Sequence, residues 1–132
     1  AEILGRLGSD AADAAARIGD VPVLVYATTA PEEVAAAQRA LGAARAATLV
    51  EDAFRTIARA LVDAGVGAFV VAGGETSGAV VEALGVRALA IGPEIAPGVP
   101  WTRALGDRPL WLALKSGHFG GDDFFARASA AL

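Results

Sequence analysis

The stretch AFVVAGGETSGAVVEALGVRALAIG, residues 68–92, carries the pattern that decides the fold. The β-branched run at 68–72 predicts a strand, and the glycine-rich segment at 73–78 predicts a turn. An apolar segment at 79–85 predicts a short helix that ends at a glycine, and 87–92 predicts a second strand. Two strands joined through a helix are typical of a parallel sheet.

The residues upstream continue this alternation of helix and strand. The alanine-rich segment 8–18 predicts a short helix, and VPVLVYA at 21–27 predicts a buried strand. A helix is expected at 28–42, with Thr29–Glu32 at capping-box spacing. Apolar residues three or four apart at 48–64 predict an amphipathic helix.

The residues downstream add a proline-rich segment and one more strand and helix. PEIAPGVPW at 93–101 holds three prolines and is expected to form a rigid loop. PLWLALK at 109–115 predicts a strand, SGHFGG at 116–121 a second glycine-rich turn, and 122–132 a closing helix. The complete pattern predicts a single α/β domain with a three-layer, mainly parallel, Rossmann-like sheet flanked by helices.

Composition excludes several classes of protein. The 132 residues suit one domain, and a hydrophobic content of 55% can form a core. A net charge of −4 without any basic run argues against nucleic-acid binding. No long apolar stretch or signal peptide is visible, so we expect a cytoplasmic protein that does not bind membranes. The chain has no cysteine, and His118 is its single histidine, which excludes thiolate and histidine-rich metal sites within it.

The first glycine-rich segment has the properties of an anion site. It follows a predicted strand, where open α/β sheets bind ligands. Gly73 and Gly74 allow a ligand to approach the backbone closely, and Thr76 or Ser77 can cap the next helix, whose N-terminus attracts phosphate. The alternative is an ordinary strand–helix turn. The segment matches neither the Walker A nor the G-x-G-x-x-G pattern.

The second glycine-rich segment contains the chain's one lysine, which occurs against ten arginines. Lys115 ends a predicted strand and could reach a phosphate as a compact charge, or it could be an ordinary surface lysine. His118 could act as a base, and a hydrolase that uses Ser77 or Ser116 with His118 stays open as an alternative.

Three segments together resemble one family. VVAGGETSGAVVEALGV at 70–86, IGPEIAPGVPW at 91–101 and LALKSGHFGGDDFF at 112–125 are similar, in this order, to the C-terminal, nucleotide-binding domain of the four-carbon acid sugar kinases. The resemblance is dense over residues 66–128. It implies an enzyme that phosphorylates threonate, erythronate or their oxo derivatives with ATP.

The resemblance also implies the site. ATP would contact the residues that match the family's two loop signatures, which are Gly73, Gly74, Glu75, Thr76, Ser77, Lys115, Ser116 and Gly117. Lys115 would neutralise charge on the transferred phosphoryl group. Mg²⁺ would accompany ATP, and Glu75 is the acid in these loops that could contact it.

Two departures from the family limit what the resemblance implies. The family usually has asparagine where this chain has His118. Its N-terminal domain, which carries an Asp-Asp-x-Thr-Gly motif and binds the acid sugar, has no match in residues 1–132. We therefore expect residues 1–132 to be the C-terminal part of a longer two-domain kinase, inactive alone, with the general base in the other domain. A homo-oligomer is left open, and a non-catalytic nucleotide or small-molecule sensor is the alternative function.

Overall fold

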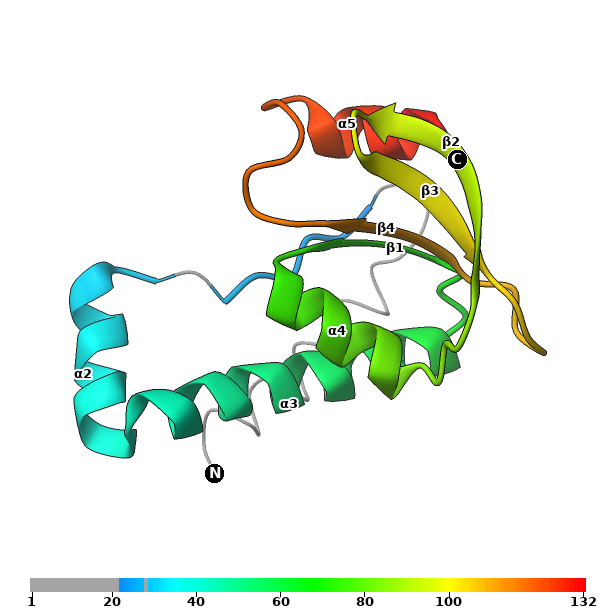
Figure 1. The fold of residues 1–132 in the computed structure, drawn as a ribbon. Coiled ribbons are helices and arrows are strands. Elements are labelled where there is room, and N and C mark those ends of the chain that lie inside the picture. The colour runs from blue at the N-terminus through cyan, green and yellow to red at the C-terminus, as the bar shows by residue number, and fades with distance from the viewer. Residues whose placement is uncertain (1–21, 28) are drawn as a thin grey trace.

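The computed structural model describes residues 22–27 and 29–132 and is shown in Figure 1. The helix expected at 8–18 lies outside the described residues. In chain order the elements are α2 (Pro31–Leu41), α3 (Ala43–Asp63), β1 (Ala68–Ala72), α4 (Gly74–Ala83), β2 (Leu89–Ala96), β3 (Val99–Ala104), β4 (Trp111–Lys115) and α5 (Phe124–Ala130). The chain is thus an α/β domain, as the sequence predicts.

The sheet is mixed, so the expectation of a mainly parallel sheet is wrong. Its strand order is β1-β4-β3-β2. Among the described strands, β1 and β4 form the one parallel pair, with Ala68 opposite Trp111 and Ala72 opposite Lys115. The β4–β3 and β3–β2 pairs are antiparallel. The two strands that are joined through α4, β1 and β2, do not pair with each other and lie at opposite edges of this sheet.

The proline-rich segment 93–101 is a hairpin, not the rigid loop that was expected. It forms the end of β2, a tight turn and the start of β3. Gly98 has a φ of 77° in this turn, and its amide donates to a carboxylate oxygen of Glu94 over 3.2 Å. The prolines are tolerated because Pro93 lies at an irregularity of the ladder and Pro100 precedes the first β3–β4 pair.

The upstream elements differ in detail from their predictions. Residues 22–27 form no strand, and the side chains of Leu24 and Tyr26 are 68% and 69% exposed, so the predicted buried strand is wrong for this part. The helix after it is confirmed as α2, but no side chain caps it. The hydroxyl of Thr29 donates to Glu33 and not to the backbone, so the capping box is absent. The next helix, α3, is confirmed and begins earlier than expected.

Helices cover both faces of the sheet, which confirms a three-layer arrangement (Figure 1). On one face, Val71 of β1 packs with Ala58 of α3 and Val80 of α4. On the other face, α5 packs on a cluster that includes Trp101 and Phe124. Burial of both faces fixes β1 and β4 in the middle layer, and with them the loops that follow these strands.

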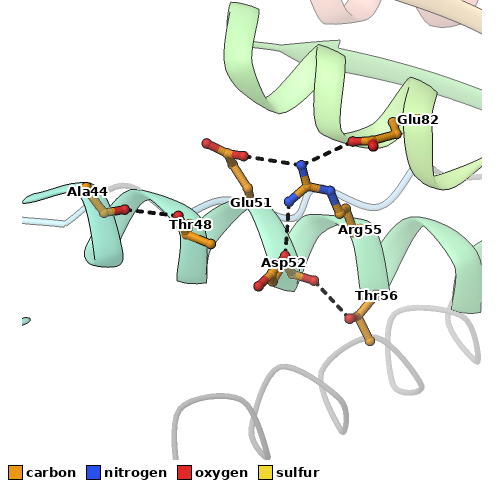
Figure 2. A network of polar contacts seen from close by, with 7 residues as sticks. All are labelled: Ala44, Thr48, Glu51, Asp52, Arg55, Thr56 and Glu82. Carbon is orange, nitrogen blue, oxygen red and sulfur yellow. Dashed lines mark hydrogen bonds and ion pairs between the residues drawn. The ribbon is translucent and has the colours of Figure 1, made fainter.

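Polar contacts tie the two helices of the first face together. Figure 2 shows the guanidinium of Arg55 on α3 between two acids of its own helix and one acid of α4. Its distances are 3.3 Å to Glu51, 3.0 Å to Asp52 and 3.3 Å to Glu82.

Among the described residues, no helix is long and apolar enough to cross a membrane.

Candidate functional site

The two glycine-rich segments meet at one edge of the sheet. Since β1 and β4 are parallel neighbours, their carboxyl ends lie together. The backbone amide of Gly73, directly after β1, donates to the carbonyl of Lys115 at the end of β4 over 2.8 Å. The structure therefore brings together two segments that lie far apart in the sequence, each of which is a predicted ligand loop.

The first segment is a helix start and not the turn at 73–78 that was expected. Helix α4 begins at Gly74, and Gly73 alone links it to β1 as the N-cap residue. No side chain caps the helix, so the expected capping by Thr76 or Ser77 is wrong, because both lie inside its first turn. The amides of Gly74, Glu75 and Thr76 are the helix's first N–H groups, which have no intrahelical acceptor. They form a small set of donors at the positive end of the helix dipole.

The two adjacent glycines meet different requirements. Gly73 has a φ of 113°, a conformation that side-chain-bearing residues rarely adopt. Gly74 does not have a positive φ, and a Cβ added to it would meet no heavy atom within 4 Å. The fold therefore needs glycine at 73 but not at 74. A bare backbone at 74 leaves room for a ligand beside the first turn of α4.

The side chains of this first turn point in different directions. Ser77 is buried, its hydroxyl donates to the carbonyl of Val71 over 3.5 Å, and its amide donates to the carbonyl of Gly73 over 2.9 Å. Both of its donors thus serve the junction between β1 and α4. Glu75 is exposed and Thr76 is half-buried.

The second segment supplies a positive charge. Lys115 is half-buried, and its Nζ donates to the carbonyls of Ser116 and Gly117 over 3.3 and 3.4 Å. The same Nζ lies 5.6 Å from the ring centroid of Phe124, a cation–π contact that the sequence alone does not predict. Within the described part of the chain, none of the ion pairs involves Lys115. Its charge is therefore available to an anionic ligand.

Other candidate groups do not converge with these loops. Ser116, Gly117 and His118 are exposed. Ser77 is committed to the junction with β1, so no hydrogen bond joins it to His118 in the described structure, and a Ser–His pair for hydrolysis gains no support. The described residues also contain no cluster of three or more histidine, cysteine, aspartate or glutamate side chains that could hold a metal.

Fold and geometry thus define an α/β domain with backbone donors and one lysine at the carboxyl edge of a parallel strand pair. Residues 3–125 match the model of a family described as the nucleotide-binding C-terminal domain. The match spans most of the 132 residues, and the chain belongs to this family.

Proteins similar to this chain are kinases by name. A 3-oxo-tetronate kinase of Pseudomonas fluorescens is 64% identical over 83% of this chain and 26% of its own length. A 3-oxo-tetronate kinase of Cupriavidus necator is 59% identical over 94% of this chain and 29% of its own length. The chain therefore spans between a quarter and a third of these relatives.

Solved structures share the fold. A crystal structure from Salmonella typhimurium, provisionally called a tRNA synthase, matches with a TM-score of 0.85 and 41% identity. The match covers 95% of this chain and 30% of that one. The arrangement described above is thus also found as one part of a longer protein.

Proposed function

We propose that this chain is the ATP-binding domain of a kinase that phosphorylates a four-carbon acid sugar of the threonate, erythronate or 3-oxo-tetronate class. The observation that carries the proposal is the hydrogen bond from Gly73 to Lys115. It sets a helix N-terminus with free amides beside a lysine that pairs with no acid among the described residues. The names of the similar proteins supply the reaction class.

The first loop would hold phosphate oxygens through its backbone. The amides of Gly74, Glu75 and Thr76 can donate to an anion at the N-terminus of α4. The absence of a Cβ at Gly74 lets the oxygens come within hydrogen-bond distance of these amides. Ser77 supports this loop by fixing α4 against β1.

The second loop would supply the positive charge of Lys115, which would neutralise negative charge during phosphoryl transfer. Phosphoryl transfer depends on positioning and on neutralisation of negative charge rather than on covalent chemistry with the protein. Lys115 can exchange its two long hydrogen bonds to loop carbonyls for contacts with a phosphate. Ser116 and Gly117, exposed beside it, would complete the cradle.

Magnesium fits this site only together with the nucleotide. Mg²⁺ keeps several waters and is commonly held by one or two carboxylates plus substrate phosphates. The exposed Glu75, in the first turn of α4, is the carboxylate that could take this part, directly or through water. When bound, Mg²⁺ would neutralise charge on the phosphates.

The acid sugar and the general base are assigned to the remainder of the parent kinase, because the chain spans only 26% and 29% of two similar kinases. We therefore expect residues 1–132 alone to bind ATP weakly and to phosphorylate neither threonate nor erythronate. A cytoplasmic location stays a prediction of the sequence, and a homo-oligomer stays open.

An ATP titration of the isotope-labelled chain, followed by NMR, tests the proposal. We expect shifts at Gly74, Glu75 and Thr76 and at Lys115, with a Kd weaker than about 1 μM, because part of the site lies elsewhere. The matched variant Gly74→Val should lose these shifts. Millimolar ATP that leaves residues 73–77 unshifted would refute the phosphate-loop assignment.

A further inference from the structure

Strand β1 has the side chains of an interior strand but the position of an edge strand. All five of its residues, AFVVA, are apolar. Phe69 and Val71 pack toward α3 and α4, whereas Ala68 and Val70 pack toward the cluster on the other face. Such continuous apolar sequence, covered on both faces, is typical of parallel strands that have a neighbour on each side. Yet in the described structure β1 pairs with β4 alone.

The pairing shows which backbone groups of β1 lack a partner. The carbonyl of Gly67 accepts from Trp111, and the amide of Gly73 donates to Lys115, both over 2.8 Å. Because successive residues of a strand alternate in direction, the odd-numbered residues face β4. The amides and carbonyls of Ala68, Val70 and Ala72 then face the open edge, where no described residue pairs with them.

The opposite edge of the sheet, formed by β2, is protected from pairing with a further strand. Strand β2 has register shifts between Ile91 and Glu94 and between Glu94 and Ala96. It also carries Pro93 and the charged Glu94. Irregularities, prolines and charges are the usual means by which edge strands avoid further pairing. Strand β1 carries none of these, so its edge is open to another strand.

We propose that the open edge of β1 receives an additional apolar strand from the part of the parent kinase outside these 132 residues. The inference rests on the proposed function in one respect, that the chain is one domain of a longer protein. The Salmonella structure shows that such sequence exists in a similar protein, since this chain covers 30% of it.

Other occupants fit less well. Residues 22–27 are apolar and belong to the described structure, yet they do not join the ladder. Residues 8–18 are alanine-rich and lack a β-branched run. A second copy would pair two edges of five residues each, whereas a stable interface commonly involves about 20–30 residues on each side.

The added strand also has a consequence for the candidate site. Ala72, whose backbone faces the open edge, directly precedes Gly73 and the first turn of α4. A strand hydrogen-bonded to Ala72 therefore reaches the loop that we assign to phosphate binding. The ATP site of the parent kinase is completed on this side by residues outside the chain.

Amide hydrogen exchange of the full-length protein without nucleotide tests the proposal. We expect the amides of Val70 and Ala72 to exchange at least about 100-fold more slowly than in the 132-residue chain, where no described residue pairs with them. The amide of Val71, which faces β4, should be protected and serves as the internal control. Fast exchange at Val70 beside slow exchange at Val71 in the full-length protein would overturn the proposal.

Two further outcomes would also overturn it. Protection of Val70 in the 132-residue chain alone would assign the edge to the chain's own residues. Protection that disappears when the full-length protein is diluted to monomer would assign it to a second copy. Because no nucleotide is present, failure of this experiment is distinct from failure of the ATP titration.

Proline variants of the full-length protein give a second readout. Val70→Pro removes a donor that faces the proposed strand, and Val70→Ala measures the lost side-chain packing separately. Ile91→Pro is the control on the protected edge, where the side chain is 79% exposed. We expect Val70→Pro to lower the melting temperature more than Val70→Ala and Ile91→Pro combined. Equal effects would contradict a strand at this edge.

Discussion

The two glycine-rich loops lie at the same edge of the sheet but are built in opposite ways. After β1, a single residue with a φ of 113° leads directly into α4, and a buried serine fixes the junction. After β4, the exposed residues 116–123 separate the strand from α5. The first loop offers backbone donors that are already in place, whereas the second offers one charge that must be redirected. We infer that the first loop determines whether the nucleotide binds and the second how fast it reacts.

Loss of the lysine tests the second half of this comparison and should have the largest effect on the rate of the reaction. We expect Lys115→Ala in the full-length kinase to lower kcat by about 10²–10³-fold, as is typical for groups that stabilise developing charge. The Kd for ATP should change much less. Steady-state kinetics with a separate nucleotide titration distinguish the two. A kcat equal to that of the wild type would make Lys115 an ordinary surface lysine.

Substitutions of Gly73 and Gly74 test the first half of the comparison, that the first loop determines whether the nucleotide binds. Gly74→Val should abolish ATP binding with little loss of stability, because a Cβ at 74 meets nothing in the fold. Gly73→Val should instead cost about 1–3 kcal/mol of stability, because its φ of 113° strains any β-branched residue. Melting temperature and ATP affinity, measured on both variants, separate the two roles. The comparison fails if Gly74→Val melts as low as Gly73→Val and its folded fraction still binds ATP.

Removal of the buried hydroxyl should have a smaller effect. Ser77→Ala loses one hydrogen bond between α4 and the carbonyl of Val71, which we expect to cost about 1 kcal/mol. The affinity for ATP should fall little, since Ser77 serves the junction and not the open side of the loop. Denaturant unfolding and an ATP titration measure the two quantities. A large loss of affinity at unchanged stability would mean that the hydroxyl contacts the nucleotide.

The histidine of the second loop should have the smallest effect. His118 is exposed, and surface substitutions usually change stability by less than about 0.5 kcal/mol. His118→Asn, which introduces the residue usual in the resembling family, should leave both stability and kcat of the full-length kinase near the wild-type values. A strong loss of activity in this variant would assign His118 a chemical role that its surroundings do not suggest.

The sequence predicted most of the elements that depend on local patterns, but the apolar run at 22–27 forms no strand in the described structure. The apolar runs of β1 and β4 and the periodicity of α3 are confirmed, since each is a property of one segment. The hairpin of β2 and β3 was missed because three prolines within nine residues are typical of a loop. Whether a proline is tolerated depends on where it lies in the ladder, and that is fixed only by the neighbouring strand.

The site could be predicted as two lists of residues but not as an arrangement. Glycines after a strand indicate a ligand loop, and both loops were selected for that reason. The hydrogen bond between the backbones of Gly73 and Lys115 exists because β1 and β4 are neighbours in the sheet. The sequence does not reveal this, since α4, β2 and β3 lie between the two strands in the chain. The burial of Ser77 could not be predicted either. A serine at the start of a helix can cap the helix or hydrogen-bond inside the core, and the sequence does not distinguish the two roles.

The mixed sheet also implies an order in which its strands pair during folding. The hairpin of β2 and β3 joins residues that are close in sequence, and such hairpins form within about 1–10 μs. Strand β1 must wait for β4, because the long intervening chain has to close before Gly73 can meet Lys115. During synthesis, β1 leaves the ribosome before β4, the strand with which it pairs in the described structure. We expect the two glycine-rich loops to be among the last parts of the domain to form.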